Sequence, residues 1–375
     1  MKLSVLGSTG SVGSNALQIV SAYRGRFELV GIMARRASPQ LLLQAQQLRP
    51  RYVVSYEEPT SHWLSSLPEG TKYLRGEEGL MALLEESERI LNAISGVDGL
   101  LPTYHTLTKG KVLLASNKES VICLPDLIRE HISRVVPVDS EHNALFQLLS
   151  FVDPHHVKKV YLTASGGPFK DTPLQELPYV RVEQALNHPR WKMGKKITVD
   201  SATLINKGIE IIEAQVLFDL SPETIEVVIH PQSYVHGIVS LKDGSFLFHT
   251  SQTDMKVPLL HALFYPERVE YPFQQMDLLD LSPITFEPVD TQKFRAVDIC
   301  RWVAKRGGVY VPVLLGADEA AVEMFLAGEI PFTGIVETIE KVLNAVNLPD
   351  PKSLEDIIEA VRWGYHKARE MAKVL

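Results

Sequence analysis

A glycine pattern near the N-terminus constrains the fold of this 375-residue chain more than any other feature. Gly7, Gly10 and Gly13 directly follow an apolar strand pattern over residues 3–6 and open an amphipathic helix pattern. Glycines at such a turn permit a tight bend and let backbone N–H groups approach a pyrophosphate, which then lies at the positive end of the helix. The spacing differs from the commoner Gly-x-Gly-x-x-Gly, and three glycines can also be turn chemistry alone. In this context they predict a dinucleotide site.

Short apolar runs alternate with helical patterns along the first 150 residues, which predicts a parallel, doubly wound sheet. A helix start is predicted at Ser38-Pro39, a capping residue followed by proline at the first helical position. The expected strands are residues 3–6, 28–33, 52–55, 90–94, 112–115 and 135–138.

The pattern changes after residue 150. A strand is expected over residues 159–164, a helix over 207–218, and a hairpin around Asp243-Gly244, which separates two alternating runs. Prolines then interrupt a stretch with little periodicity, and helical patterns follow near residues 293–306, 312–327, 333–346 and 353–374.

These patterns predict an α/β protein in four parts. They are a Rossmann-like dinucleotide-binding domain (1–150), a central α/β domain (151–265), a linker (266–291) and a C-terminal domain of four helices (292–375).

Composition excludes several classes of function. The net charge of -7 gives no basic footprint for nucleic acid, and no apolar run reaches membrane-spanning length, so we expect neither partner. The two cysteines, Cys123 and Cys300, lie far apart among apolar neighbours, so we expect no disulfide framework and no thiolate metal site. This usage favours a cytoplasmic protein.

Arg35 and Arg36 follow the second expected strand, where an NAD-binding enzyme carries an acidic residue for the ribose hydroxyls. A carboxylate there would repel a 2′-phosphate, whereas two guanidinium groups can bind it. The pair therefore favours NADPH over NADH, unless it is merely a solvated basic pair at a loop tip.

Acidic residues follow two other expected strands. Asn117-Lys118-Glu119 comes after residues 112–115, and Asp139-Ser140-Glu141 comes after residues 135–138, so both lie at the ligand-binding edge of the sheet. If the extended conformation persists, Asp139 and Glu141 point the same way and repel each other unless a cation lies between them. Oxygen ligands favour Mg²⁺ or Mn²⁺. Alternatively, these acids cap helices or are solvated.

A second polar group precedes the helix expected at residues 207–218. Ser201, Asn206 and Lys207 place a hydroxyl, an amide and an ammonium at a helix N-terminus, a suitable phosphate site, and Glu210 offers a third carboxylate. A capped helix with a first-turn acid would look similar.

The loop over residues 185–196 is basic but carries Trp191 and Met193, which suits a lid that closes over a ligand or, alternatively, a loop anchored by a buried Trp. His230 and His236 lie near strands, where histidines are usually satisfied core residues, so we do not expect them to be catalytic.

Several long motifs together resemble one family. They are GSTGSVG at 7–13, ASNKES at 115–120, PVDSEHNA at 137–144, TASGGPF at 163–169, HPRWKMGKKITVDSATLINKGIE at 188–210 and HPQSYVHG at 230–237. The chain is similar to the 1-deoxy-D-xylulose 5-phosphate reductoisomerase family. The resemblance implies rearrangement and reduction of that sugar phosphate to 2-C-methyl-D-erythritol 4-phosphate for isoprenoid synthesis. It also implies NADPH, a divalent cation (Mg²⁺ or Mn²⁺, with Co²⁺ as a third option) and a homodimer.

The resemblance also implies residue roles. The implied metal ligands are Asp139, Glu141 and Glu210. The implied catalytic residues are Lys118, Glu141, His188 and Trp191. Substrate contacts are implied for Ser140, Glu141, Ser165, His188, Ser201, Asn206, Lys207 and Glu210. The cofactor contacts are Gly7, Thr9, Gly10, Ser11, Val12, Arg35, Arg36, Asn117, Glu119 and Gly194, with Met255 near the nicotinamide. Ala34-Arg35-Arg36 departs from a Gly-Lys-Asn-like run in many members, which affects the details of the 2′-phosphate contacts.

Two alternatives stay open at this point. Another NADP-dependent dehydrogenase of a small phosphorylated substrate, of the semialdehyde or glyceraldehyde-phosphate type, would need a nucleophilic cysteine. Cys123 lies in an apolar run without an evident base, so this alternative is weak. A non-enzymatic NADP-binding protein would leave the carboxylates, the lysines and the lid unexplained.

Overall fold

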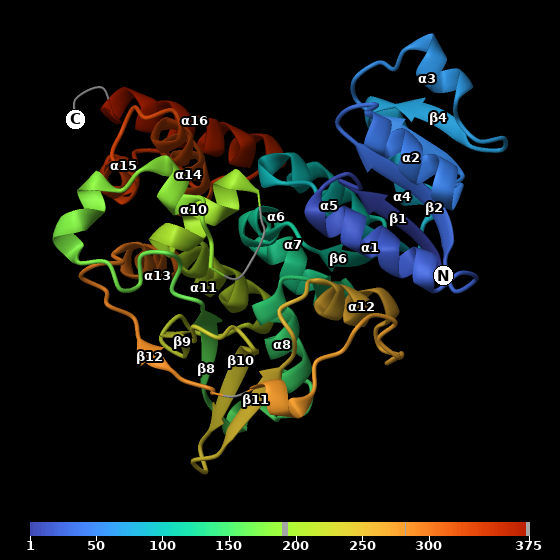
Figure 1. Ribbon diagram of the computed structural model, residues 1–375. Coiled ribbons are helices and arrows are strands. Elements are labelled where there is room, and N and C mark those ends of the chain that lie inside the picture. Colours follow the sequence, from blue (N-terminus) through green and yellow to red (C-terminus); the bar gives the residue numbers. More distant parts are fainter. Residues whose placement is uncertain (190–193, 282, 373–375) are drawn as a thin grey trace. The chain divides into compact units, whose positions relative to one another are not determined.

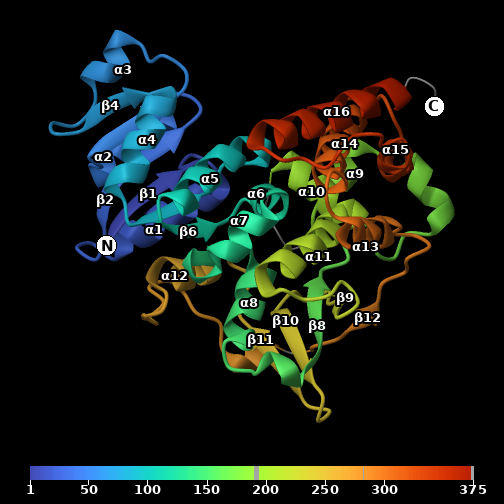
Figure 2. The ribbon, with the colours of Figure 1, turned by 180° about the vertical axis from the view of Figure 1, so that it is seen from behind.

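The computed structural model describes residues 1–189, 194–281 and 283–372, and the chain divides into two compact units (Figures 1 and 2). Unit 1 consists of Met1–Asn143 and Asp254–Gln275, and unit 2 consists of Ala144–Thr253 and Met276–Leu375. This division is by compactness, so the boundaries of the four functional parts proposed from the sequence remain predictions. Among the described residues, no helix is both long enough and apolar enough to cross a bilayer.

Unit 1 contains a parallel sheet of seven strands in the order β4-β3-β2-β1-β5-β6-β7, which confirms the predicted doubly wound sheet. The strands are β1 (Lys2–Leu6), β2 (Glu28–Ala34), β3 (Tyr52–Ser55), β4 (Lys72–Arg75), β5 (Arg89–Asn92), β6 (Val112–Ala115) and β7 (Val135–Pro137). Strand β4 was not predicted from the sequence. This edge strand has four residues, and its charged ends are exposed, so it carries little hydrophobic signal.

Helices pack on both faces of this sheet. Figure 1 shows α1 and α2 in front of the strands, and Figure 2 shows α4 and α5 on the opposite side. The helices of unit 1 are α1 (Ser11–Ala22), α2 (Pro39–Leu48), α3 (Ser61–Ser65), α4 (Gly76–Glu86), α5 (Leu100–Thr108), α6 (Lys118–Cys123), α7 (Pro125–Glu130) and α12 (Lys256–Phe264), with short 3-10 turns at η1 (Gly96–Gly99) and η2 (Ile132–Arg134). The Ser38 hydroxyl accepts a hydrogen bond from the Leu41 N–H at 3.2 Å, which confirms the predicted start of α2.

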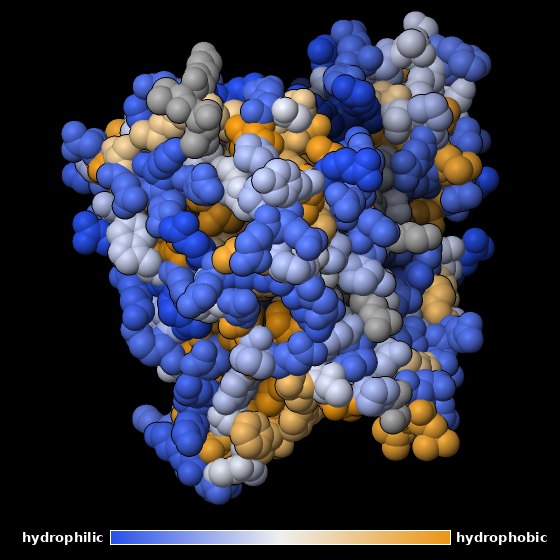
Figure 3. All heavy atoms as spheres, turned by 60° about the vertical axis from the view of Figure 1, so that its left-hand side comes forward, coloured by the Kyte–Doolittle hydropathy of each residue, from blue (hydrophilic) through white to orange (hydrophobic). Residues whose placement is uncertain are grey.

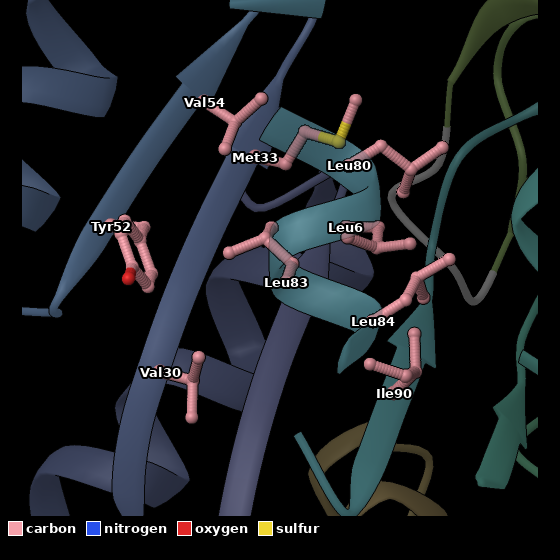
Figure 4. Close-up of a cluster of buried hydrophobic side chains, with 9 residues drawn as sticks. All are labelled: Leu6, Val30, Met33, Tyr52, Val54, Leu80, Leu83, Leu84 and Ile90. Atoms are coloured by element: carbon pink, nitrogen blue, oxygen red, sulfur yellow. The ribbon is translucent and has the colours of Figure 1, made fainter. Parts of the chain in front are cut away.

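Apolar side chains from α4 fill the space against the strands (Figure 4). Leu80, Leu83 and Leu84 are fully buried because they recur at helical spacing on the face that meets the sheet. Each fully buried leucine contributes about 1.5–3 kcal/mol relative to an exposed one. The strands contribute Leu6, Val30, Met33, Tyr52, Val54 and Ile90 to the same cluster.

Helix α12 belongs to unit 1, although more than 100 residues separate it in the sequence from Asn143, where the first segment of that unit ends. The Arg89 guanidinium donates to the Tyr265 carbonyl at 2.6 Å, just beyond the end of α12. Phe264 is buried, and its ring meets those of Tyr23 and Phe27 edge-on at 4.8 and 4.9 Å between centroids. These contacts hold α12 to the N-terminal part of the chain.

Unit 2 contains a mixed sheet of five strands in the order β11-β10-β8-β9-β12. The strands are β8 (Val157–Ala164), β9 (Ile225–Ile229), β10 (Val235–Leu241), β11 (Phe246–Thr250) and β12 (Glu287–Pro288), and only β8 and β9 pair in parallel. Asp243 and Gly244 lie in the turn between β10 and β11, and the Asp243 carboxylate accepts the Ser245 N–H at 2.9 Å. The predicted hairpin is confirmed.

The rest of unit 2 is helical. Its helices are α9 (Val182–Ala185), α10 (Lys195–Thr203), α11 (Ile205–Phe218), α13 (Ala296–Arg306), α14 (Tyr310–Leu326), α15 (Phe332–Asn344) and α16 (Leu354–Ala372), with η3 (Pro154–His156), η4 (Leu174–Tyr179) and η5 (Leu278–Leu281). Helix α14 packs against α13, α15 and α16, so the predicted helical C-terminal region is confirmed. Helix α8 (Ser140–Leu149) begins in unit 1 and ends in unit 2.

Candidate active site

The glycine turn after β1 has the geometry of a phosphate-binding turn. Gly7 has φ 77°, and a Cβ atom on Gly7 would lie 2.4 Å from the Ala93 carbonyl oxygen. A Cβ on Gly13 would lie 2.3 Å from the Gly7 oxygen, so only glycine fits at either position. Gly10 is the N-cap of α1, and no described side chain caps this helix end. The first-turn N–H groups therefore face outward, suited to an anion.

This turn lies where the strand order reverses. β1 has β2 on one side and β5 on the other, which is the crevice where open α/β sheets bind ligands. The N–H groups of Gly7 and Ser8 both donate to the Met33 oxygen at 2.8 and 2.9 Å, so the turn is tied to the end of β2.

Two glutamines of α2 support the turn, and neither was predicted from the sequence. Gln44 accepts a hydrogen bond from the Ser8 hydroxyl at 2.9 Å and donates to the Ser8 carbonyl at 2.8 Å. Gln40 donates to the Thr9 carbonyl at 3.1 Å. A signal for Gln44 was available, because it lies among buried Leu41 and Ala45 on the apolar face of α2 and a polar residue there needs a partner.

The predicted 2′-phosphate residues Arg35 and Arg36 are exposed and directly follow β2. The Arg35 carbonyl accepts the N–H groups of Tyr56 and Glu57 at 3.2 and 3.1 Å, which joins this loop to the one after β3. The Arg36 Nε donates to Glu57 Oε1 at 3.1 Å.

Asn117 and Lys118 begin α6 at the end of β6. The Asn117 oxygen accepts the Ser120 N–H at 2.6 Å, and its amide donates to the carbonyls of Ile94 and Gly96 at 2.5 and 2.8 Å. The described contacts of Asn117 therefore cap α6 and hold the loop after β5. The predicted cofactor residue Glu119 is half-buried in the first turn of α6.

Lys118 forms an ion pair with Asp139, the acidic residue that follows β7. Its Nζ lies 2.8 Å from Asp139 Oδ2, and both side chains are largely buried. Burial favours the neutral form of Asp139, but the charges of Lys118 and His142 outweigh it and hold the pKa of Asp139 well below its usual value. Asp139 therefore stays ionised and can bind a cation.

The extended conformation does not persist through residues 139–141. β7 ends at Pro137 and α8 begins at Ser140, and the Asn143 N–H donates to the Asp139 carbonyl at 2.8 Å. Asp139 thus precedes the first helical turn, and Glu141 lies within it. Their carboxylates still approach, with an oxygen of each within 4.8 Å of the other, and the Ser140 hydroxyl donates to Glu141 Oε2 at 2.5 Å.

Three predicted substrate residues meet in unit 2. The Nε2 of His188 lies 3.2 Å from the Ser165 Oγ and 3.1 Å from the Ser201 Oγ. Burial lowers the pKa of His188, which favours a neutral ring that can share a proton with either hydroxyl. Ser165 follows β8 and Ser201 lies in the last turn of α10, so residues from three segments converge here.

Gly166 and Gly167 let the loop after β8 approach α10. Both have positive φ, 87° and 67°, and a Cβ on Gly167 would lie 3.0 Å from the Ser201 carbonyl oxygen. The Ser165 hydroxyl accepts the Gly167 N–H at 3.2 Å. The loop and the end of α10 therefore form one compact polar group.

The sequence predicted Ser201 at the N-terminus of the following helix, but Ser201 lies in the last turn of α10 instead. α10 ends at Thr203, Leu204 takes the left-handed conformation at φ 59°, and α11 begins at Ile205. A left-handed leucine is strained and is retained only where its surroundings enforce it, a situation common at functional sites. Leu204 is buried, which provides that enforcement.

The first turn of α11 carries the remaining predicted residues. Lys207 Nζ lies 2.5 Å from Glu210 Oε2, and both side chains are buried. The Asn206 amide donates to the other oxygen, Oε1, also at 2.5 Å. The i to i+3 and i+4 spacing brings these groups onto one face of α11.

Other predicted residues are placed more simply. Trp191 and Met193 lie outside the described residues. Gly194 is exposed at the N-cap of α10, and Met255 is the N-cap of α12. His230 is buried, with Nδ1 donating to the Thr285 carbonyl at 2.9 Å, as expected of a satisfied core histidine.

A cysteine nucleophile is absent from the described part of the chain. Cys123 and Cys300 are both buried, and burial raises the pKa of each thiol far above its usual value. Burial therefore opposes formation of the thiolate that a cysteine-dependent dehydrogenase needs.

Family models match most of the chain. The model of 1-deoxy-D-xylulose 5-phosphate reductoisomerase matches residues 3–124, and that of its C-terminal domain matches residues 135–218. A further model, the DXP reductoisomerase C-terminal domain, matches residues 250–367.

Relatives and solved structures agree over the full length. The 1-deoxy-D-xylulose 5-phosphate reductoisomerase of Aquifex aeolicus is 62% identical over 99% of this chain and 98% of its own, and that of Thermomicrobium roseum is 45% identical over 98% and 97%. A crystal structure of DOX-P reductoisomerase with NADPH, fosmidomycin and magnesium matches with a TM-score of 0.92 at 34% identity, covering 100% of this chain and 98% of that one. The Zymomonas mobilis enzyme with NADPH also gives a TM-score of 0.92, at 33% identity, over 100% and 99%. The chain belongs to the 1-deoxy-D-xylulose 5-phosphate reductoisomerase family.

Proposed function

We infer that this protein converts 1-deoxy-D-xylulose 5-phosphate to 2-C-methyl-D-erythritol 4-phosphate, using NADPH and a divalent cation. The observation that carries the inference is the match over the whole chain to a solved relative whose crystals contain NADPH, fosmidomycin and magnesium. The described chemistry agrees with it, because the chain has a phosphate-binding turn, the ionised carboxylate of Asp139 with that of Glu141 near it, and a polar group in unit 2.

The turn after β1 fits a dinucleotide. A side chain at Gly7 or Gly13 would collide with backbone, so these positions keep open the space that a pyrophosphate needs. We propose that the cofactor contacts are Gly7, Thr9, Gly10, Ser11, Val12, Arg35, Arg36, Asn117, Glu119 and Gly194. Arg35 and Arg36 are included because they directly follow β2. NADPH supplies the hydride for the reduction.

The carboxylates fit a hard cation. Asp139 and Glu141 offer oxygen ligands, and Lys118 keeps Asp139 ionised, as metal binding requires. We propose that Asp139, Glu141 and Glu210 are the ligands of one Mg²⁺ or Mn²⁺ ion. When bound, this ion polarises the substrate carbonyl and stabilises negative charge on oxygen.

The polar residues of unit 2 fit the sugar phosphate. We propose that Ser165, Ser201, Asn206 and Lys207 bind its phosphate, with hydroxyl, amide and ammonium donors. His188 adds a proton that either hydroxyl can share, and Ser140 contacts the sugar. The role of Trp191 as a lid over the substrate remains a proposal from sequence.

The chain's own residues then divide the work. The phosphate group of the substrate lies far from the reacting carbons. The free energy of binding this group can therefore be used to orient the sugar and exclude water. Lys118 holds its ammonium beside Asp139, where it can donate a hydrogen bond to a substrate oxygen as negative charge develops. Asn206 and Lys207 contact Glu210 and so link the phosphate and metal residues, whereas Ser165 and Ser201 contact His188. Mutations of Ser165 or Ser201 should therefore separate phosphate binding from metal binding.

The direct test is NADPH oxidation with 1-deoxy-D-xylulose 5-phosphate, with and without a chelator. We expect turnover that stops on chelation and returns with Mg²⁺ or Mn²⁺. NADPH binding without turnover on any ketose phosphate would instead support the non-enzymatic alternative.

Replacing Glu210 by Gln tests the ligand assignment. The substitution removes one negative charge and keeps the shape, so metal affinity and turnover should fall while NADPH binding is retained. Ser201→Ala should weaken substrate binding without changing metal affinity in the absence of substrate. Loss of NADPH binding in Glu210→Gln, with metal binding intact, would contradict this arrangement.

We propose that the protein is a homodimer that uses the outer face of the unit 2 sheet. Phe246 and Phe248 on edge strand β11 are 54% and 47% exposed, and the Phe286 ring lies 5.9 Å from that of Phe248. Figure 3 shows apolar side chains gathered low in that view, at the level of the β10–β11 hairpin in Figure 1. Such aromatic surface is typical of an interface. Light scattering measures the molar mass of the Phe248→Ser variant, which should be lower than that of the parent if this face forms the dimer.

The cytoplasmic location remains a prediction.

A further inference from the structure

We propose that Glu57 determines how strongly the cofactor site discriminates NADPH from NADH, by placing a negative charge beside the residues that bind the 2′-phosphate. The proposal rests on the proposed function, since it requires that Arg35 and Arg36 receive that phosphate. It adds a residue that neither the motifs nor the family resemblance indicated.

The backbone of Glu57 is fixed next to the arginines. Its N–H donates to the Arg35 carbonyl at 3.1 Å, and its own carbonyl accepts the Ser55 hydroxyl at 2.7 Å. The Tyr73 hydroxyl donates to the same carbonyl at 3.4 Å. Glu57 is therefore attached to the ends of β2 and β3 by main-chain bonds that do not involve its carboxylate. A change of the side chain should leave this backbone in place.

The carboxylate of Glu57 reaches the guanidinium of Arg36. Glu57 Oε1 lies 3.1 Å from Arg36 Nε, while the side chains are 53% and 75% exposed. Within the described ranges, no carboxylate lies at ion-pair distance from Arg35. The loop thus presents two positive charges, of which one is already paired.

The charge of Glu57 acts against a bound 2′-phosphate. A phosphate monoester carries about -1.5 to -2 charges near neutral pH. It would lie against Arg36 and hence within a Debye length of Glu57, which is about 10 Å at 0.1 M salt. The phosphate must either displace the carboxylate from Arg36 or bear its repulsion. NADH has a hydroxyl at this position and bears neither cost, and a nearby carboxylate can accept a hydrogen bond from that hydroxyl.

Glu57→Gln removes the charge and keeps an acceptor for Arg36. An exposed ion pair of this kind corresponds to at most about a fivefold change in an equilibrium constant. We expect NADPH to bind about three- to fivefold more tightly to Glu57→Gln, and NADH to bind equally well or more weakly. The gain should shrink as NaCl rises from about 0.02 to about 0.5 M, because the charges are exposed.

Glu58→Gln is the matched control. Glu58 is the next residue, but its carboxylate pairs with Arg75 at 3.1 Å rather than with Arg36, and both side chains are exposed. The two variants have the same net charge, so a general effect of charge would appear in both. We expect the affinity of Glu58→Gln for NADPH to stay within about twofold of the parent.

The measurement is fluorescence titration with NADPH and NADH, repeated by calorimetry with 2′,5′-ADP and 5′-AMP. Tighter binding of the two 2′-phosphate ligands by Glu57→Gln alone supports the proposal. Unchanged or weaker NADPH binding by Glu57→Gln overturns it, as does an equal gain in Glu58→Gln. If the parent protein binds neither NADPH nor 2′,5′-ADP, the proposed function itself fails.

Discussion

Replacing Lys207 by Met removes the ammonium that pairs with a buried carboxylate in α11. Lys207 and Glu210 are 5% and 1% exposed and lie 2.5 Å apart, so little water is available to solvate the charge that remains. Breaking a buried pair from one side costs about 3–5 kcal/mol. Asn206 still donates to Glu210, which places the expected loss near the lower end, at about 3 kcal/mol. For a unit of this size, that lowers the melting temperature by roughly 6–12 °C.

The assay is thermal unfolding of the parent and of Lys207→Met, in chelator and then with Mg²⁺. The double variant Lys207→Met/Glu210→Leu is the control, because replacing both partners by apolar groups is often neutral. We expect it to recover most of the lost stability. Mg²⁺ should stabilise Lys207→Met more than the parent, since a cation on Glu210 replaces the missing ammonium. A melting temperature within about 2 °C of the parent would refute the burial argument. A loss of stability that Mg²⁺ does not reverse would contradict the assignment of Glu210 as a metal ligand, but it would leave the burial argument intact.

Three further outcomes are expected. Lys196→Met should destabilise unit 2 by about 2 kcal/mol in thermal melts, because Lys196 pairs with the fully buried Asp318, and Lys196→Arg should recover most of it; equal losses would contradict the charge argument. Burial, with the charge of Arg268, lowers the pKa of His261 to about 4. As the pH falls, His261 therefore takes up a proton in the unfolded chain before it does so in the folded one. The free energy of unfolding should decrease by about 1–2 kcal/mol as the pH drops from about 6.5 to 4. Urea midpoints of His261→Gln should show a flatter dependence on pH, and an unaltered slope would exclude His261 as the cause. Arg35→Ala should weaken NADPH binding about tenfold and NADH binding little in fluorescence titration, and equal losses would remove the 2′-phosphate assignment.

The sequence predicted those features that depend on local chemistry. The turn at Gly7 and Gly13 follows from glycine in a strand-to-helix context, and the hairpin at Asp243-Gly244 follows from an Asp-Gly pair between alternating runs. The start of α2 at Ser38 follows from a cap and a proline. In each case a few neighbouring residues determine the backbone.

The errors arose where tertiary contacts decide the backbone. Leu204 adopts a left-handed conformation without a glycine or proline to announce it, so one predicted helix start became a break between two helices. Asp139 lies between β7, which ends at Pro137, and α8, which begins at Ser140, so the chain turns into a helix where a continued strand had been considered. The convergence of Ser165, His188 and Ser201 was expected from the family resemblance, which assigns all three to the substrate, whereas their spacing in the sequence carries no information about it.

The membership of α12 in unit 1 has a consequence for biosynthesis. A ribosome that has released residues 1–143 has made every strand of the seven-stranded sheet but not Phe264 or the carbonyls that Arg89 binds. Tyr23 and Phe27 must await a partner until residue 264 emerges. At about 5–20 residues per second this wait is on the order of 10 s. Nascent chains stalled before α12 should therefore expose an apolar surface around Tyr23 and Phe27, and should be the species that chaperones bind.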